Sequence, residues 1–174
     1  MNRRLFLAVI PAALAAGCGF QLRRLEGIPF ASMYINAPHG GAVAERLREA
    51  LASNKQTRLT ATPAEAEAVL QLGQEKRTKV ILSLSGGGRV TEYRLGLELR
   101  YSIVSQDGRA LTAPETIELT RDITYDDAQI LAKGAEEQLL YRDMEDNAAL
   151  RILRRLQAIK PGPGVEPSGT GVEP

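Results

Sequence analysis

The 174-residue chain has almost none of the side chains on which most catalytic and metal sites depend: it contains one cysteine, Cys18, and one histidine, His39. A lone thiol excludes an intramolecular disulfide, and one cysteine with one histidine is too small a set for a zinc site. His39 stands in the turn-like stretch APHGG, so we expect a solvated turn residue there rather than a catalytic base. The sequence therefore predicts a protein with no catalytic residue, no cofactor and no metal.

The chain also has almost no excess of charge of either sign, and it has few aromatic side chains. The 22 basic and 21 acidic residues give a net charge of +1, so any anionic partner must be met by a local cluster of cations. The chain has no tryptophan and only 5% aromatic residues, which leaves few rings on which nucleic-acid bases could stack. We therefore expect no nucleic-acid partner.

The chain begins with the layout of an export signal. Arg3 and Arg4 precede an apolar run over residues 5–16, whose 12 residues are fewer than the roughly 20 that a membrane-spanning helix needs. The run leads into LAAGC, which resembles a bacterial lipobox and supplies Cys18 as the nucleophile that takes up lipid. This predicts a lipoprotein signal peptide over residues 1–17 and a lipid anchor on Cys18; an ordinary signal peptide with a chance cysteine is the alternative. By resemblance to other Gram-negative lipoproteins, Gly19 in place of aspartate implies the periplasmic face of the outer membrane.

Composition divides the mature chain into three parts. Residues 18–32 are interpreted as a lipidated tether, residues 33–160 as an α/β sandwich domain, and residues 161–174 as a disordered tail. Four prolines and four glycines leave that tail too little apolar surface to bury. Within the domain, MYINA over residues 33–37 predicts a short strand. Val43, Leu47 and Leu51 then recur every four residues, which predicts an amphipathic helix over about residues 42–53.

A period of two follows over residues 69–84, with an interruption at 73–76 where we expect a bend or a bulge. One parity carries most of the apolar side chains, and we expect these on one face of the sheet: Leu70, Leu72, Val80, Leu82 and Leu84. The clearest strand covers residues 93–103, in which apolar or aromatic residues alternate without exception with polar residues or glycine. A turn at QDG, residues 106–108, leads to a further strand through residues 111–123.

A long final helix completes the pattern. Asp126 and Asp127 suit its N-terminus. An apolar stripe at four-residue spacing marks its buried face: Leu140, Met144, Ala148, Ile152 and Leu156. The element order β-α-β-β-β-α predicts an α+β fold, a two-layer α/β sandwich whose mainly antiparallel four-stranded sheet is covered on one face by two helices.

Two short stretches invite a reading as functional sites. SLSGGG, residues 83–88, lacks the Lys-Ser/Thr end of a phosphate-binding loop and the glycine that precedes the serine of a hydrolase elbow, so it predicts a plain hairpin turn. EKRTK, residues 75–79, places Lys76, Arg77 and Lys79 close together. This run is either a solvated strand or a local binding surface for an anion.

Three longer motifs together resemble the LptE family, the lipoprotein subunit of the outer-membrane lipopolysaccharide translocon. They are CGFQLR at the cysteine, VTEYRLGLELRYSIV after the glycine turn, and ITYDDAQILAKGAEEQLLYRDM before the last helix, and the resemblance extends over roughly residues 18–160. It implies a two-layer α/β fold and a non-catalytic protein that sits as a plug inside the LptD β-barrel, assists assembly of that barrel and binds lipopolysaccharide. It also implies lipopolysaccharide-binding cations in two places, for which Arg89 and Lys133 are the candidates. The basic run of Lys76, Arg77 and Lys79 is the next candidate, on its composition alone.

Two other function classes compete with this one. The first is a generic outer-membrane lipoprotein scaffold, such as an accessory of the barrel-assembly machine, which differs in the partner that it would bind. The second is a periplasmic lipid-processing enzyme, which would need a nucleophile and a base in one cleft. The lipopolysaccharide hypothesis fits the composition, since a few Arg and Lys side chains can bind lipid A phosphates through charge-assisted hydrogen bonds.

Overall fold

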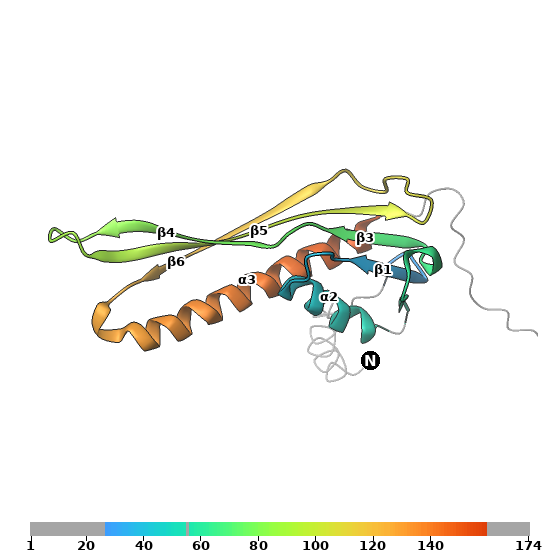
Figure 1. Cartoon of the computed structure of the whole chain (residues 1–174). Helices are drawn as coiled ribbons and strands as arrows, with labels where there is room; N and C mark the ends of the chain where they lie inside the picture. The colour runs from blue at the N-terminus through green and yellow to red at the C-terminus, as the bar shows by residue number, and fades with distance from the viewer. Residues whose placement is uncertain (1–26, 55, 160–174) are drawn as a thin grey trace, which may run out of the picture.

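The computed structural model describes residues 27–54 and 56–159. A six-stranded sheet forms one layer, and the helices α2 and α3 form a second layer on one of its faces (Figure 1). The elements are β1 (Ser32–Asn36), α2 (Ala42–Ala52), β2 (Arg58–Leu59), η1 (Pro63–Glu65), β3 (Ala68–Leu72), β4 (Lys76–Leu84), β5 (Val90–Ser105), β6 (Glu115–Thr124), η2 (Asp127–Gln129) and α3 (Ile130–Ala158). The predicted α+β fold is confirmed, but the sheet has six strands rather than four.

The long strand β5 organises the sheet. Along one edge it pairs antiparallel with β6, and along the other edge it pairs antiparallel first with β4 and then with β3. β1 runs parallel to β3, and the two-residue strand β2 runs parallel to β1. The count rises because TRLTAT, residues 57–62 and a possible short strand by sequence, contains β2, and because the predicted 69–84 strand is divided into β3 and β4.

A β-bulge separates β3 from β4. Leu72 lies opposite Tyr101 and Lys76 lies opposite Glu98, so residues 73–75 face only two residues of β5. The Gly73 N–H donates to the Arg100 carbonyl oxygen at 2.8 Å, which holds the bulged strand against β5. The predicted bulge is confirmed.

The bulge reverses which residues face the helices, because one extra residue moves every later side chain to the opposite face. Leu70 and Leu72 are buried under the helices, as expected. Val80, Leu82 and Leu84 are exposed instead. Val80 lies opposite Arg94 on the face that the helices leave open, and the register with β5 shifts again between Ile81 and Leu84. The prediction that all five share one buried face is therefore wrong.

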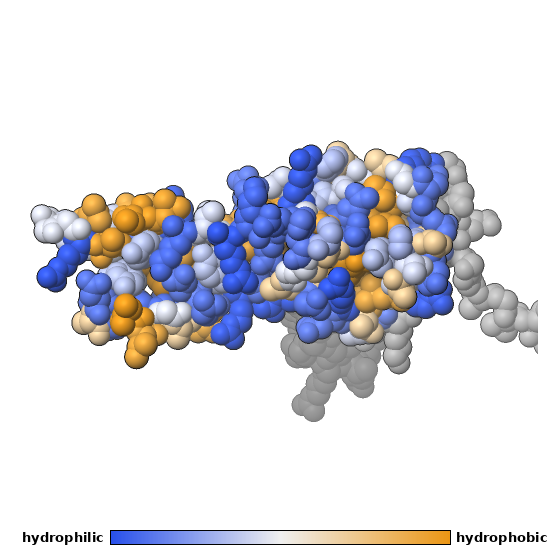
Figure 2. All heavy atoms as spheres, viewed as in Figure 1, coloured by the Kyte–Doolittle hydropathy of each residue, from blue (hydrophilic) through white to orange (hydrophobic). Residues whose placement is uncertain are grey.

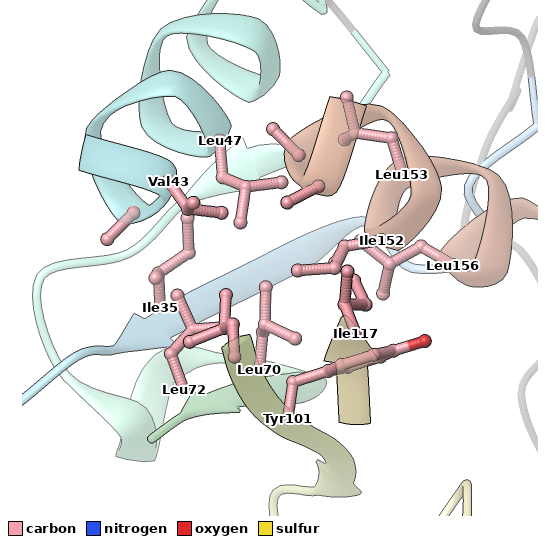
Figure 3. Packing of buried hydrophobic residues seen from close by; sticks show 14 of the residues in the cluster. Ile35, Val43, Leu47, Leu70, Leu72, Tyr101, Ile117, Ile152, Leu153 and Leu156 are labelled. Atoms are coloured by element: carbon pink, nitrogen blue, oxygen red, sulfur yellow. The ribbon is translucent and has the colours of Figure 1, made fainter. Parts of the chain in front are cut away.

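The apolar core lies where both helices cover the sheet. Val43 and Leu47 of α2 point toward Ile35 and Leu70, and Ile152 of α3 lies beside them (Figure 3). The predicted stripe of α3 is buried from Met144 to Leu156, whereas Leu140 is only half-buried. Ile28 and Phe30 are also buried, so the packed domain begins before residue 33.

The strand predicted through residues 111–123 begins later. Leu111 and Thr112 both donate their N–H groups to the Ile103 carbonyl oxygen, at 2.9 and 3.2 Å, within a loop that folds back on β5. β6 then runs from Glu115 to Thr124. Within the described part of the chain, no helix combines the length and the apolar character needed to cross a bilayer.

Candidate functional site

The hairpin formed by β4 and the paired part of β5, residues 76–98, extends beyond the apolar core, and we call it the hairpin arm. Figure 1 shows the first turns of α3 reaching the same end of the molecule and diverging from the arm. The turn at the tip closes through the Ser85 N–H, which donates to Arg89 O at 2.8 Å, and Gly88 adopts a φ of 78° that favours glycine. SLSGGG is thus a hairpin turn, as predicted.

Arg89 stands at this tip. Its N–H donates to Ser85 Oγ at 3.2 Å, and its side chain is exposed. The described residues provide no ion-pair partner for its guanidinium. Arg89 therefore presents an uncompensated positive charge at the end of the arm.

Lys133 lies at the same end of the molecule, on the first turns of α3. The junction before this helix is held to the arm because Tyr125 donates its N–H to Thr91 O at 2.8 Å. Lys133 Nζ donates to Thr124 Oγ1 at 3.0 Å and to Glu136 Oε2 at 2.9 Å, and only 16% of its side chain is exposed. Lys133 must therefore exchange existing partners before it can bind an anion, whereas Arg89 need not.

The structure separates the three cations of EKRTK. Lys76 lies on the open face of the sheet, 3.4 Å from Glu98. Arg77 and Lys79 lie on the face toward α3, where Arg77 pairs with Glu145, and Lys79 Nζ lies 2.6 Å from Glu137 Oε2. These residues do not form one basic surface, because two of them join the sheet to the helix.

Large apolar side chains are exposed around the arm. We define the apolar tip as Val80, Ile81, Leu82 and Leu84, which expose between 40 and 57% of their surface. The first turns of α3 add Ile130 and Leu131, the latter 88% exposed. Figure 2 shows apolar surface on both projections at this end of the molecule. Exposed apolar surface gathered in one region is typical of an interaction site.

Comparison with known proteins identifies the family. The family model described as "LptE: Lipopolysaccharide-assembly" matches residues 30–156. The chain belongs to the LptE family. Two proteins named LPS-assembly lipoprotein LptE are similar over 91% of this chain and 88% of their own length: that of Photorhabdus laumondii is 26% identical, and that of Pectobacterium atrosepticum is 24% identical. The resemblance found in the three motifs is thereby confirmed.

Solved structures agree with the LptE assignment. The solution structure of lipoprotein B from Nitrosomonas europaea shares 34% sequence identity, with a TM-score of 0.69 over 80% of this chain and 91% of the other. The crystal structure of rare lipoprotein B from Shewanella oneidensis shares 27% identity, with a TM-score of 0.62 over 72% of this chain and 92% of the other. The LptE match includes both the hairpin arm and the start of α3.

A polar clamp ties these LptE elements together where the apolar core ends. The Glu145 carboxylate, only 3% exposed, pairs with Arg77 of β4 and accepts from Arg46 Nη2 of α2 at 3.0 Å. Beside it, Tyr141 Oη donates to Thr78 O at 2.8 Å. The sequence analysis did not identify this clamp, although Glu145 directly follows Met144 of the apolar stripe, and an acid beside a buried position is a signal for it.

Farther from the apolar core, Lys79 contacts two aromatic rings as well as an acidic side chain. Its Nζ lies 4.4 Å from the centroid of the Tyr93 ring and 5.9 Å from that of Tyr125, and these two rings meet edge to face at 5.2 Å. The hydrogen bond to Glu137 raises the Lys79 pKa, and partial burial opposes this shift. Lys79 therefore remains a cation that bridges the arm and α3.

One pocket in this LptE fold bears on the enzymatic alternative. It has a volume of ≈ 460 Å³, lies around the β-bulge, and includes Gly73, Arg100 and Ser102 in its lining. Ser102 Oγ donates to Gln71 Oε1 at 3.2 Å, and the lining contains neither a histidine nor a carboxylate that could act as a base. The described residues also contain no cluster of three His, Cys, Asp or Glu side chains suited to a metal.

Proposed function

We propose that this chain is the non-catalytic lipoprotein partner of an LptD-like outer-membrane β-barrel, and that it binds lipopolysaccharide at the end formed by the hairpin arm and the start of α3. The observation that carries the proposal is Arg89, which has no ion-pair partner among residues 27–54 and 56–159 and lies beside the exposed apolar tip. Lipid A is an amphiphile with phosphate groups and acyl chains. A free guanidinium next to apolar side chains offers complementary contacts to both parts.

Lys133 supplies the second cation in this proposal. Lys133 lies on α3 just after the junction at Tyr125, whose N–H donates to Thr91 O. Thr91 is two residues after Arg89 in the chain. A phosphate that approaches Lys133 would replace the oxygens of Thr124 and Glu136. Lys76, Arg77 and Lys79 are weaker candidates because their ammonium or guanidinium groups already bridge strands or layers of the fold.

The anchor completes the proposed function. Cys18, the predicted signal peptide over 1–17, the tether before residue 27 and the tail over 161–174 lie outside the described residues. We propose that lipid on Cys18 holds the domain on the periplasmic face of the outer membrane, where a barrel partner is in reach. Several acyl chains on one cysteine provide stable anchoring, whereas a single chain does not.

Two experiments test the proposal. The full-length protein, isolated from detergent-solubilised outer membranes, is expected to co-purify with one large β-barrel protein. Recovery of the barrel-assembly complex instead would support the generic scaffold. Intact-mass measurement of the same sample is expected to show loss of residues 1–17 and a lipid on Cys18, and a chain that retains Met1 would contradict the anchor.

Lipopolysaccharide binding is tested with charge reversals. Arg89→Glu with Lys133→Glu is expected to weaken binding of purified lipopolysaccharide about tenfold or more, since each charge-assisted hydrogen bond is worth about 1.5–3 kcal/mol. Arg109→Glu is the matched control, because Arg109 also follows a glycine of positive φ, Gly108, but at the opposite end of β5. Equal binding by the double variant and the control would contradict the proposed site.

A further inference from the structure

The pocket around the β-bulge, which we call the bulge pocket, lies apart from the end proposed to bind lipopolysaccharide. Its lining includes Gly73, Arg100 and Ser102, and its volume of ≈ 460 Å³ falls within the range of about 300–1,000 Å³ that small-ligand sites occupy. Arg89 stands just before β5, a strand of 16 residues that spans roughly 50 Å, and Arg100 lies in the second half of this strand. The bulge pocket and the tip of the arm are therefore separate surfaces.

Three strands build the polar side of the bulge pocket. Asn36 of β1 lies opposite Gln71 of β3, and Gln71 lies opposite Ser102 of β5, so the three side chains form a row on one face of the sheet. This is the open face, because Ile35 and Leu70, their neighbours in the chain, point toward the helices (Figure 3). Ser102 Oγ donates to Gln71 Oε1 at 3.2 Å, which leaves the N–H groups of that amide for a ligand.

Arg100 supplies a positive charge beside this row. It lies two residues before Ser102, on the same face of β5, and it lines the pocket. Glu98, two residues farther toward the arm on that face, pairs with Lys76 instead. Within the described part of the chain, neither the Arg100 guanidinium nor the Asn36 amide has a polar partner, and no acidic residue lines the pocket. The bulge pocket thus gathers one cation and two amides whose donors face no acceptor of this chain.

These groups match the chemistry of a sugar that carries a carboxylate. The Arg100 guanidinium can bind a carboxylate through two parallel N–H···O bonds. The Asn36 and Gln71 amides can each donate to one hydroxyl group and accept from another, as neighbouring hydroxyls of a sugar ring require. Pro38 and Pro114 also line the pocket and offer apolar surface to the C–H side of such a ring. A phosphate carries up to two negative charges and would meet only one cation here.

We propose that the bulge pocket binds an acidic sugar, with Arg100 on the carboxylate and with Asn36 and Gln71 on ring hydroxyls. This site goes beyond the proposed function and does not depend on the cations Arg89 and Lys133. Two sources can supply such a sugar: the saccharide part of lipopolysaccharide, or a separate acidic saccharide. The chemistry that the pocket recognises is the same in both.

The first test uses two sugars that differ in one group. Methyl glucuronide has a carboxylate where methyl glucoside has a hydroxymethyl group. Each is titrated into the isotope-labelled full-length protein in detergent micelles, and the side-chain amide signals of Asn36 and Gln71 are followed by NMR. We expect the glucuronide to shift both signals and to saturate them at millimolar concentration, and the glucoside to bind at least about tenfold more weakly. Equal shifts with both sugars, or shifts with neither, would overturn the inference.

The second test removes the charge. Arg100→Gln changes an exposed side chain, so the fold is retained, and we expect it to weaken glucuronide binding about tenfold or more. Arg94→Gln is the matched control, because Arg94 lies on the same strand and face but pairs with Asp122 at 2.7 Å, outside the bulge pocket. We expect this control to bind the glucuronide normally. The inference is wrong if the two variants bind equally.

Inorganic phosphate tests the class of anion. We expect it to shift the Asn36 and Gln71 amide signals only at higher concentration than the glucuronide does, because phosphate has no ring hydroxyls for these amides to bind. Asn36→Ala is expected to weaken glucuronide binding severalfold and to leave the response to phosphate unchanged. A site that prefers phosphate, or an Asn36→Ala variant that binds the glucuronide normally, would contradict an acidic-sugar site.

Competition then identifies the source and keeps the two proposals apart. Purified lipopolysaccharide that displaces the glucuronide would assign the bulge pocket to its saccharide part, and lipopolysaccharide that binds without displacing it would assign the pocket to a separate saccharide. Arg89→Glu with Lys133→Glu is expected to bind the glucuronide normally. If the unaltered chain binds the glucuronide but no lipopolysaccharide, the proposed function fails alone; if it binds lipopolysaccharide but no glucuronide, the bulge-pocket inference fails alone.

Discussion

At the scale of single residues, two carboxylates each join three elements of the fold. Glu145 connects α3 to α2 through Arg46 and to β4 through Arg77. Glu115, at the start of β6, accepts from Tyr101 Oη and from Arg155 Nε, both at 2.7 Å, and so joins β5, β6 and α3. Each acid satisfies donors from two other elements, so its loss leaves partners without an acceptor.

The Glu145 clamp gives a stability prediction. Glu145→Gln removes a buried charge that two guanidinium groups face, and we expect a loss of about 3 kcal/mol in the free energy of unfolding. Asp146→Asn is the control, because Asp146 pairs with the same Arg46 at 2.5 Å but is 61% exposed, and we expect about 0.5 kcal/mol or less. Urea unfolding of the two variants makes the comparison, and equal losses would show that burial of Glu145 does not matter.

Glu115 gives a prediction for pH. The hydrogen bond from Tyr101 lowers the Glu115 pKa below its ordinary value of 4.5, and Arg155 adds to this shift against the effect of burial. Because the folded pKa is the lower one, the contribution to stability is present above about pH 4.5 and is lost as the pH falls through the folded pKa. We therefore expect Glu115→Gln to destabilise the protein at pH 7 more than at pH 3, as measured by thermal melts. An equal effect at both values would contradict the assignment.

At the scale of elements, regular alternation predicts the structure well until an extra residue intervenes. β5 keeps a strict period of two, and Leu95, Leu97 and Leu99 are buried as the sequence indicates. β3 and β4 also alternate, but the bulge at residues 73–75 turns Val80 to the open face. The sequence pattern shows where the alternation is interrupted. It does not show how many residues of β5 lie opposite the interruption, and that number decides which face of the sheet the later side chains of β4 occupy.

The same limit applies to the candidate site. The turn at residues 83–88 and the helix start at Asp126, whose carboxylate accepts from the Ala128 N–H, follow from local residue chemistry and are predictable. The partners of Arg77 and Lys79 lie on α3, 68 and 58 residues away in the chain, and no local pattern contains that pairing. Ion pairs between layers depend on tertiary packing, which is why the sequence left these cations as candidates for anion binding.

Adjacent positions in β5 allow a direct test of its alternation. Leu97→Asp places a charge without a partner in the core, and we expect a loss of several kcal/mol or failure to fold. Glu98→Ala removes an exposed side chain 3.4 Å from Lys76, and we expect about 0.5 kcal/mol or less. Thermal melts compare the two variants. Similar destabilisation by both would mean that the open face of the sheet is covered after all.

At the scale of the whole molecule, the two layers are held together differently along their length. Around α2 the layers share the apolar core, whereas the start of α3, before Tyr141, contacts the sheet mainly through polar groups: Glu137 with Lys79 of the hairpin arm, and Lys133 with Thr124 of β6. Polar contacts that are partly open to water contribute less than buried apolar area. The end proposed to bind lipopolysaccharide is therefore the end at which the layers separate most easily.

This difference along α3 predicts a gradient in hydrogen exchange. Amides of residues 130–140 are expected to exchange faster than those of residues 144–156, because opening the first part breaks few apolar contacts. Lys79→Ala removes the bridge to Glu137 and the contact with the Tyr93 ring, so we expect exchange in residues 130–140 to rise severalfold while residues 144–156 are unaffected. Arg94→Ala is the control, since Arg94 pairs with Asp122 at 2.7 Å within the open face of the sheet and does not touch the helix layer. If Lys79→Ala and Arg94→Ala change exchange in residues 130–140 equally, Lys79 is not the contact that holds the two layers together at this end.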